Sequence, residues 1–268
     1  MTIGNFWIET KSSYAFLERN LHLCKRYIGW EIVFLVYTTV NTLTIGLIGK
    51  SMGSDENTLY LIIGALLWSF LSALFHEVAE TIGWERWEGT LEYTFMAPVH
   101  RLTHLLGVCT YAIIYGLLRS ILVLIATVFF FHLNLVGANL IGAFLVMAAS
   151  CLPFIGMGLA AAVLPLMSPE KGSQATHIIQ GIILLVSGVY YSIDYLPAWL
   201  KPLSYISPAT YTLQGVRGAL LNSTPTRELL PEILILVLAG VILIPAGYRI
   251  FLAGERYAKR HGKLKRSG

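Results

Sequence analysis

The sequence predicts an all-α integral membrane protein that crosses the bilayer with six helices. Of its 268 residues, 56% are hydrophobic and only 13% are charged, and the mean hydropathy is +0.67. A soluble domain carries about a quarter charged residues. Several apolar runs are almost free of charge and long enough for a helix to cross roughly 30 Å of hydrocarbon. We interpret residues 1–268 as one membrane domain, because no linker divides them.

The six predicted spans follow the apolar runs along the chain. They cover residues 28–48, 59–79, 105–131, 139–166, 175–191 and 232–252. The short segments of alternating hydrophobicity that are typical of a membrane β-barrel do not occur. The sequence therefore favours a bundle of helices.

The distribution of Lys and Arg predicts the orientation of these spans. With the N-terminus inside, fourteen of the nineteen Lys and Arg residues fall on the cytoplasmic side and four fall outside. Positive residues accumulate in the cytoplasmic loops of membrane proteins. We therefore expect a multi-pass protein of the inner (cytoplasmic) membrane with both termini in the cytoplasm.

Residues 12–27 predict an amphipathic helix ahead of the first span. Apolar residues recur at helical spacing, and charged residues occupy the other faces. The apolar positions are Tyr14, Leu17, Leu21, Cys24 and Ile28, and the charged ones are Glu18, Arg19, Lys25 and Arg26. Because Lys and Arg gain about 1 kcal/mol each near anionic lipid, we expect this helix to lie among the lipid headgroups. A solvated, loosely ordered leader is the alternative. We expect the basic tail 256–266 to anchor the other end.

A short polar segment, ERWEGTLEYTFMAPVHR over residues 85–101, lies between the second and third spans on the predicted cytoplasmic side. Residues 85–94 predict a short helix that Pro98 ends, since proline cannot continue a helix. Its apolar stripe at helical spacing consists of Trp84, Trp87, Leu91 and Phe95. Such a compact protruding segment is suited to docking on a cytoplasmic partner. The alternative interpretation is an ordinary short helix that joins two spans.

Arg119 lies inside the third predicted span. An arginine there costs about 2.5–3.5 kcal/mol on insertion scales, so it usually faces protein or a wet cavity. Arg119 therefore either places a charge in a translocation path or at a subunit interface, or forms a structural pair with a polar group within the bundle. The spans show no evident acidic partner for it, which disfavours an ion-coupled secondary transporter. His76–Glu80 resembles an incomplete zinc-protease motif, which we interpret as a polar helix end, and we expect no catalytic residues and no metal site.

Two motifs in the right order resemble ABC-2 type permeases, the membrane subunits of type V ABC exporters. The first is ERWEGTLE followed by APV, within residues 84–99. The second runs from SGVY at 187–190 through LPAWLKPL at 196–203 and ISPATY at 206–211 to Arg217. The resemblance covers nearly the whole chain.

The resemblance implies two functional segments. A coupling helix within residues 84–98 would fit a cleft on an ATPase subunit, and re-entrant helices within residues 192–228 would close the outer end of the pathway. The implied coupling residues are Glu85, Arg86, Glu88, Gly89, Thr90, Leu91 and Glu92. The expected residues of the path or gate are Arg119, Tyr190, Tyr191, Pro197, Trp199, Pro208 and Tyr211.

The implied function is that of a transmembrane permease subunit of an ATP-driven exporter. It would move an amphipathic drug or lipid-like molecule outward, as a homodimer in contact with membrane lipids. A separate ABC ATPase subunit would bind ATP and Mg, so the chain itself would hold no cofactor and bind no nucleic acid. Polysaccharide or glycolipid export is the first alternative, with Tyr111, Tyr115, Tyr190 and Tyr191 available to stack on sugars. An ion-coupled transporter and an intramembrane hydrolase are the others.

Overall fold

The computed structural model describes residues 3–133 and 137–262. In this part of the chain the regular elements are all helical, which confirms the predicted all-α class. The long helices are α1 (Ile3–Arg26), α2 (Ile28–Ser51), α3 (Asp55–Glu88), α5 (Arg101–Phe131), α6 (Leu140–Ala161) and α11 (Leu230–Arg260). The shorter ones are α4 (Leu91–Met96), α7 (Val163–Met167), α8 (Pro169–Val186), the 3₁₀ helix η1 (Ile193–Tyr195), α9 (Lys201–Ile206) and α10 (Pro208–Leu221).

Five helical stretches of the described chain are long and apolar enough to cross a membrane. They are α2, α3, α5, the stretch Leu140–Met167 that joins α6 and α7, and α11. The predicted span 175–191 corresponds to α8, which is not among them, so the six-span count is not confirmed. Helix α8 is polar over its first half, and it ends at Val186, shortly before Gly188 adopts a left-handed φ of 67°.

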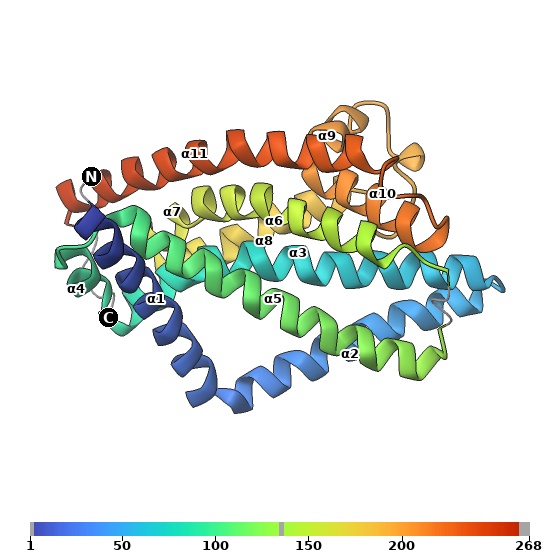
Figure 1. Ribbon diagram of the computed structural model, residues 1–268, viewed down its shortest axis with the longest axis horizontal. Helices are drawn as coiled ribbons and strands as arrows, with labels where there is room; N and C mark the ends of the chain where they lie inside the picture. Colours follow the sequence, from blue (N-terminus) through green and yellow to red (C-terminus); the bar gives the residue numbers. More distant parts are fainter. Residues whose placement is uncertain (1–2, 134–136, 263–268) are drawn as a thin grey trace.

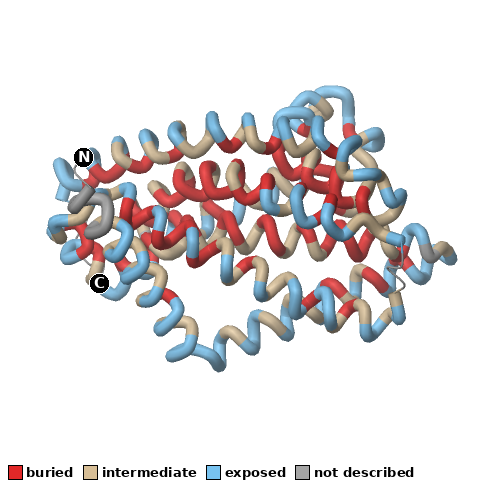
Figure 2. Tube along the Cα trace, viewed as in Figure 1, coloured by how far each residue is buried: buried red, intermediate tan, exposed pale blue. Residues whose placement is uncertain are grey.

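Helices α3 and α6 form the centre of the bundle (Figures 1 and 2). In their spanning windows 56% of the residues are buried, against 17% in α2, α5 and α11. The outer helices therefore expose large apolar faces, as expected of side chains that meet lipid rather than water. Both termini lie at one end of the bundle, and α9 and α10 lie at the other (Figure 1).

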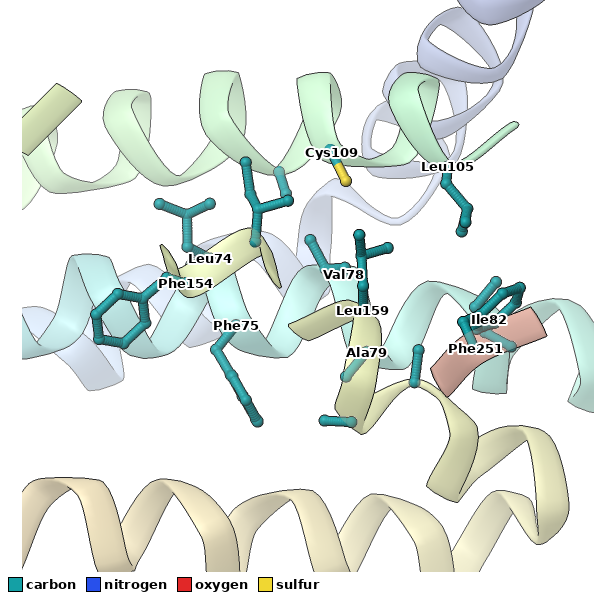
Figure 3. Packing of buried hydrophobic residues seen from close by; sticks show 14 of the residues in the cluster. Leu74, Phe75, Val78, Ala79, Ile82, Leu105, Cys109, Phe154, Leu159 and Phe251 are labelled. Carbon is teal, nitrogen blue, oxygen red and sulfur yellow. The ribbon is translucent and has the colours of Figure 1, made fainter. Parts of the chain in front are cut away.

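The main core forms where α3, α5, α6 and α11 converge (Figure 3). Helix α3 contributes Leu74, Phe75, Val78 and Ile82 from adjacent turns, and the other helices contribute Leu105, Cys109, Phe154, Leu159 and Phe251. Helices α6 and α11 approach closely at Gly247, where an added Cβ would lie 2.2 Å from the carbonyl oxygen of Gly156. Small residues of this kind allow the backbones of membrane helices to meet.

The predicted N-terminal helix exists and is longer than residues 12–27. Helix α1 packs along α5, where Phe16 and the carbonyl of Ser13 meet Gly107. Within the predicted apolar stripe, Tyr14, Leu21 and Ile28 are exposed, whereas Leu17 and Cys24 are half-buried, so the stripe faces the bundle only in part. Its place among lipid headgroups stays a prediction. At the other terminus α11 continues to Arg260, and Lys263, Lys265 and Arg266 of the basic tail lie outside the described residues.

Candidate functional site

The segment between the second and third spans folds as two helices, so the single helix expected over residues 85–94 is wrong. Helix α3 continues to Glu88 and ends at Gly89, whose φ is 77°. The N–H groups of Gly89 and Thr90 donate to the carbonyls of Arg86 and Glu85, which closes the helix end. Glycine adopts this left-handed geometry without steric cost. Helix α4 then begins at Leu91 and ends before Ala97, which is extended ahead of Pro98 as predicted.

The turn at Gly89 divides the predicted apolar stripe. Trp84 and Trp87 are more than half exposed, and their rings meet edge to face at 5.5 Å. Leu91 and Phe95 are buried in the core. What remains exposed here is a surface of aromatic, apolar and acidic side chains, which we call the α3–α4 surface. It consists of Trp84, Trp87, Glu88, Glu92, Tyr93 and Met96.

Glu85 faces the protein interior, where it joins three helices. Its carboxylate, on a residue that is 3% exposed, accepts hydrogen bonds from Arg19 of α1 and from His104 Nε2 of α5, the latter at 2.9 Å. The ring of Phe16 packs on His104 with 4.6 Å between centroids. Buried charges of this kind require partners, because an uncompensated charge in a protein interior is strongly destabilising.

Arg86 is also buried and points to a different neighbour. Its Nη1 donates to the carbonyl oxygen of Leu166 at 2.7 Å and lies 3.5 Å from that of Pro165. Both carbonyls belong to the C-terminal turn of α7, where unpaired carbonyls carry partial negative charge. The end of α3 is thereby joined to the bend that leads into α8.

A third buried cluster, which contains an ion pair, joins α5 to α11 beside α4. Arg101 Nε donates to Glu255 Oε1 at 2.9 Å, and its Nη1 donates to the Thr94 carbonyl at 3.0 Å. The guanidinium lies 4.2 Å from the centroid of the Phe95 ring. Lys259 donates to the same Glu255 oxygen at 2.6 Å. Sequence reasoning did not find these three clusters, since their partners lie on helices that are distant along the chain.

A pocket of about 300 Å³ opens between α2, α3, α5 and α8, and we call it the mid-bundle pocket. Its polar lining includes Thr38, Asn41, Ser72, His76, Arg119, His177 and Gln180. The lining also includes the aromatic rings of Phe34, Tyr37, Trp68 and Tyr190. The pocket thus combines aromatic rings with many polar groups, and converging polar groups of this kind orient a small molecule in its site.

Arg119 is held at the wall of this pocket by α2. It donates to the Phe34 carbonyl at 3.0 Å, to the hydroxyl of Thr38, and to the hydroxyl of Tyr115 at 3.3 Å. Tyr115 in turn donates to Glu31 Oε2 at 2.6 Å. The sequence showed no evident acidic partner for Arg119, because Glu31 reaches it only through this hydroxyl.

The segment before the last span forms a cap at the end opposite the termini (Figure 1). Arg217 of α10 donates to the carbonyls of Gly188 and Val189, the former at 3.0 Å, and lies 3.5 Å from the centroid of the Tyr60 ring. The hydroxyls of Ser187 and Ser207 meet at 2.7 Å.

The residues predicted for the path or gate do not form one group. Arg119 and Tyr190 line the mid-bundle pocket, whereas Tyr191 lines a second pocket of about 250 Å³ beside Arg217. Pro208 is buried at the start of α10, and the Tyr211 hydroxyl donates to the Tyr205 carbonyl at 2.8 Å. Pro197 and Trp199 are exposed on the cap.

These features define a multi-pass α-helical membrane protein with a polar pocket within the bundle and an irregular cap at one end. A sequence profile described as ABC-2 type transporter matches residues 15–221, which is well over half of the chain. The chain belongs to the ABC-2 type transporter family.

Two curated proteins of Escherichia coli strain K12 are similar to it. One is named "Inner membrane transport permease YadH"; it is 24% identical over 222 residues, which cover 81% of this chain and 84% of YadH. The other is named "Probable multidrug ABC transporter permease YbhS"; it is 26% identical over 183 residues, which cover 68% of this chain. The match spans about half of YbhS, at 46% of its length.

Proposed function

We propose that this chain is the permease subunit of an ATP-driven exporter that moves an amphipathic drug or lipid-like molecule outward. Two copies form the pathway, each with α8 as a sixth span and with both termini in the cytoplasm. A separate ABC ATPase subunit binds ATP and Mg and docks on the α3–α4 surface. Membership of the family supports the transport role, and the name of YbhS supports a drug-like substrate.

The α3–α4 surface is the observation that carries the docking proposal. Exposed aromatic residues beside acidic ones are typical of the anchors and rim of a protein interface. Trp84 and Trp87 supply the anchors, while Glu88 and Glu92 supply charge that steers a basic cleft. Such a surface has no evident role in packing the bundle itself.

The buried clusters beneath this surface provide a connection through which a movement of the docked ATPase subunit would reach the pathway. Glu85 joins α3 to α1 and α5, Arg86 joins α3 to α7, and Arg101 joins α4 and α5 to α11. Because rigid elements move together when buried ion pairs and hydrogen bonds connect them, ATP-driven motion at α4 shifts several helices at once. We therefore assign Glu85 and Arg86 to transmission within the permease and the exposed residues to docking.

The test is reconstitution of the permease with its ATPase partner in lipid. We expect the pair Glu88→Lys and Glu92→Lys to abolish substrate-stimulated ATP hydrolysis, because the reversed charges repel the docking cleft, while the permease still inserts. Glu18→Lys is the matched control, since Glu18 is an exposed acid on α1. Stimulation that survives the double reversal rules out docking at this surface, and failure of the unmodified permease to co-purify with any ATPase rules out the function itself.

An ion-coupled transporter is the second candidate, and the Arg119–Tyr115–Glu31 chain is the observation that favours it. Ionisable groups that lie within a membrane bundle often belong to proton pathways of transporters. This candidate predicts substrate uptake into vesicles without ATP, driven by an imposed pH gradient. The exporter predicts no such uptake. Sugar export receives less support, because Tyr111 is buried and stacks on Tyr115, which leaves Tyr190 and Tyr191 at the pockets.

A further inference from the structure

We propose that the mid-bundle pocket binds the anionic head of a single-chain amphipath, a carboxylate or phosphate whose tail lies along α2. The inference rests on the proposed export function and names the substrate class for it. Four properties of the pocket carry it: its charge, its unpaired nitrogen atoms, its size and its aromatic edge.

The charge of the lining favours an anion. Arg119 and the imidazoles of His76 and His177 line the pocket, and no carboxylate does so among the described residues. Glu31 lies behind the hydroxyl of Tyr115 and is not part of the lining. The neighbouring carboxylates Glu31 and Glu77 lie outside the lining, so a head group in the pocket meets Arg119 directly and an anionic head gains from this contact. The low dielectric of a membrane interior strengthens this effect.

Two buried nitrogen atoms of residues that line the pocket have no hydrogen-bond partner within the described chain. They are Arg119 Nε and His76 Nδ1. Leaving such a group unpaired costs about 1–3 kcal/mol, and more for a charged group. Native proteins rarely carry this cost without a functional reason. The oxygens of a carboxylate or phosphate accept hydrogen bonds from a guanidinium N–H, and from an imidazole nitrogen that carries a proton.

The second imidazole is oriented by its neighbours. Gln180 Nε2 donates to the Ser72 carbonyl at 3.0 Å, which turns Gln180 Oε1 toward His177 Nδ1 at 3.2 Å. The amide oxygen accepts from the ring N–H at that atom. The rings of His76 and His177 stack with 5.2 Å between centroids.

Size and exposure indicate where the tail lies. A volume of about 300 Å³ is at the lower end for small-molecule pockets, so it holds a head group and not a whole lipid. Phe34 and Tyr37 edge the pocket on α2 and are 49% and 67% exposed. The outer face of α2 continues this apolar surface. A tail that leaves the pocket at these rings stays in contact with apolar side chains and lipid.

The experiment uses the full-length permease alone, in nanodiscs of zwitterionic lipid, so that no ATPase is required. The probe is dansyl-labelled undecanoic acid, followed by dansyl fluorescence on titration. Two matched probes carry the same dansyl chain with a trimethylammonium or a glucosyl head. We expect saturable binding of the carboxylate that is at least tenfold tighter than binding of either analogue.

Variants separate the pocket from general partition into lipid. We expect Arg119→Gln to weaken carboxylate binding about tenfold, which corresponds to the loss of one charge-assisted contact. His177 lies at the exposed side of the pocket, and His177→Gln is the second variant. We expect it to weaken carboxylate binding as well, and it provides the test if Arg119→Gln fails to insert. Arg249→Gln, an exposed arginine on α11, is the matched control and should bind normally.

Equal binding of all three probes, or tighter binding of the glucosyl or cationic one, overturns the proposal. The proposal is also overturned if His177→Gln binds the carboxylate normally while Arg119→Gln either binds it normally or fails to insert. Because the readout needs no partner, these failures are distinct from loss of ATPase docking, which co-purification measures separately.

Discussion

At the scale of single residues, the protein places its buried charges where distant helices meet. Glu85, Arg86 and Arg217 each contact backbone or side-chain groups far away along the chain. A charge within a helical membrane protein is costly unless it is paired or hydrogen-bonded. These residues therefore specify which helices lie together as well as how strongly they hold.

Gly64 illustrates a close approach that only glycine permits. A Cβ at this position would lie 2.2 Å from the Val189 carbonyl oxygen and 2.7 Å from Arg217 Nη2. We expect Gly64→Ala to lower the free energy of unfolding by about 1–3 kcal/mol, because the turn at 188–190 must move away. Thermal unfolding in detergent measures this. Gly29→Ala has open space around it and should leave stability unchanged or slightly higher.

Arg86 offers a test of the contact between α3 and α7. We expect Arg86→Met to keep most of the buried volume and to lose the hydrogen bond to the Leu166 carbonyl, which contributes about 1.5–3 kcal/mol. The unfolding midpoint in a chemical denaturant should fall accordingly. The exposed Arg249→Met on α11 is the control, and an equal loss in both variants would contradict a specific role for Arg86.

At the scale of elements, two breaks in the helices shape the proposed docking segment and the cap. The left-handed turn at Gly89 separates α3 from α4, and the one at Gly188 ends the stretch that follows α8. Each break exposes backbone groups that other parts of the chain then bind. At the cap, Arg217 supplies the donors for the carbonyls of Gly188 and Val189.

The cap should loosen when these donors are removed. We expect Arg217→Met to accelerate hydrogen–deuterium exchange of peptides that cover residues 187–207, because the turn loses its only charged anchor among the described contacts. Arg227→Met, an exposed arginine on the same segment, is the matched control. Exchange that rises equally in both variants, or in neither, would show that Arg217 does not hold the cap.

At the scale of the whole molecule, α3 and α6 form an axis around which the lipid-facing helices pack (Figure 2). The Arg101–Glu255 pair closes this arrangement at the end with the termini, and its side chains are 15% and 6% exposed. Pairs that are this well buried lose the most when one partner alone is removed, since the other charge is left uncompensated.

A double-mutant cycle measures that connection. We expect Arg101→Met and Glu255→Gln to show a coupling of about 1–3 kcal/mol in the free energy of unfolding, because each loses the other as its partner. The cycle between Lys259 and Glu255 should give less than about 1 kcal/mol, since the Lys259 side chain is 46% exposed and screened by solvent. Equal couplings in the two cycles would contradict the closing role of Arg101.

The sequence by itself determined the class of protein and the position of most of the long helices along the chain. Long uncharged runs require helices that satisfy their own backbone hydrogen bonds in lipid, and this requirement is local. The same local chemistry predicted the extended Ala97 before Pro98. Periodicity did not reveal that Gly89 takes a left-handed conformation, so the residues 85–94 were expected as one helix.

Only the tertiary structure decided which polar residues work together. Glu85 and Arg86 are neighbours in the sequence that point to different helices, and Arg119 reaches Glu31 through a third residue. The mid-bundle pocket combines residues from four helices. No local sequence pattern encodes these contacts, because they depend on how the packed helices are rotated and placed. The packing of the whole core sets this arrangement.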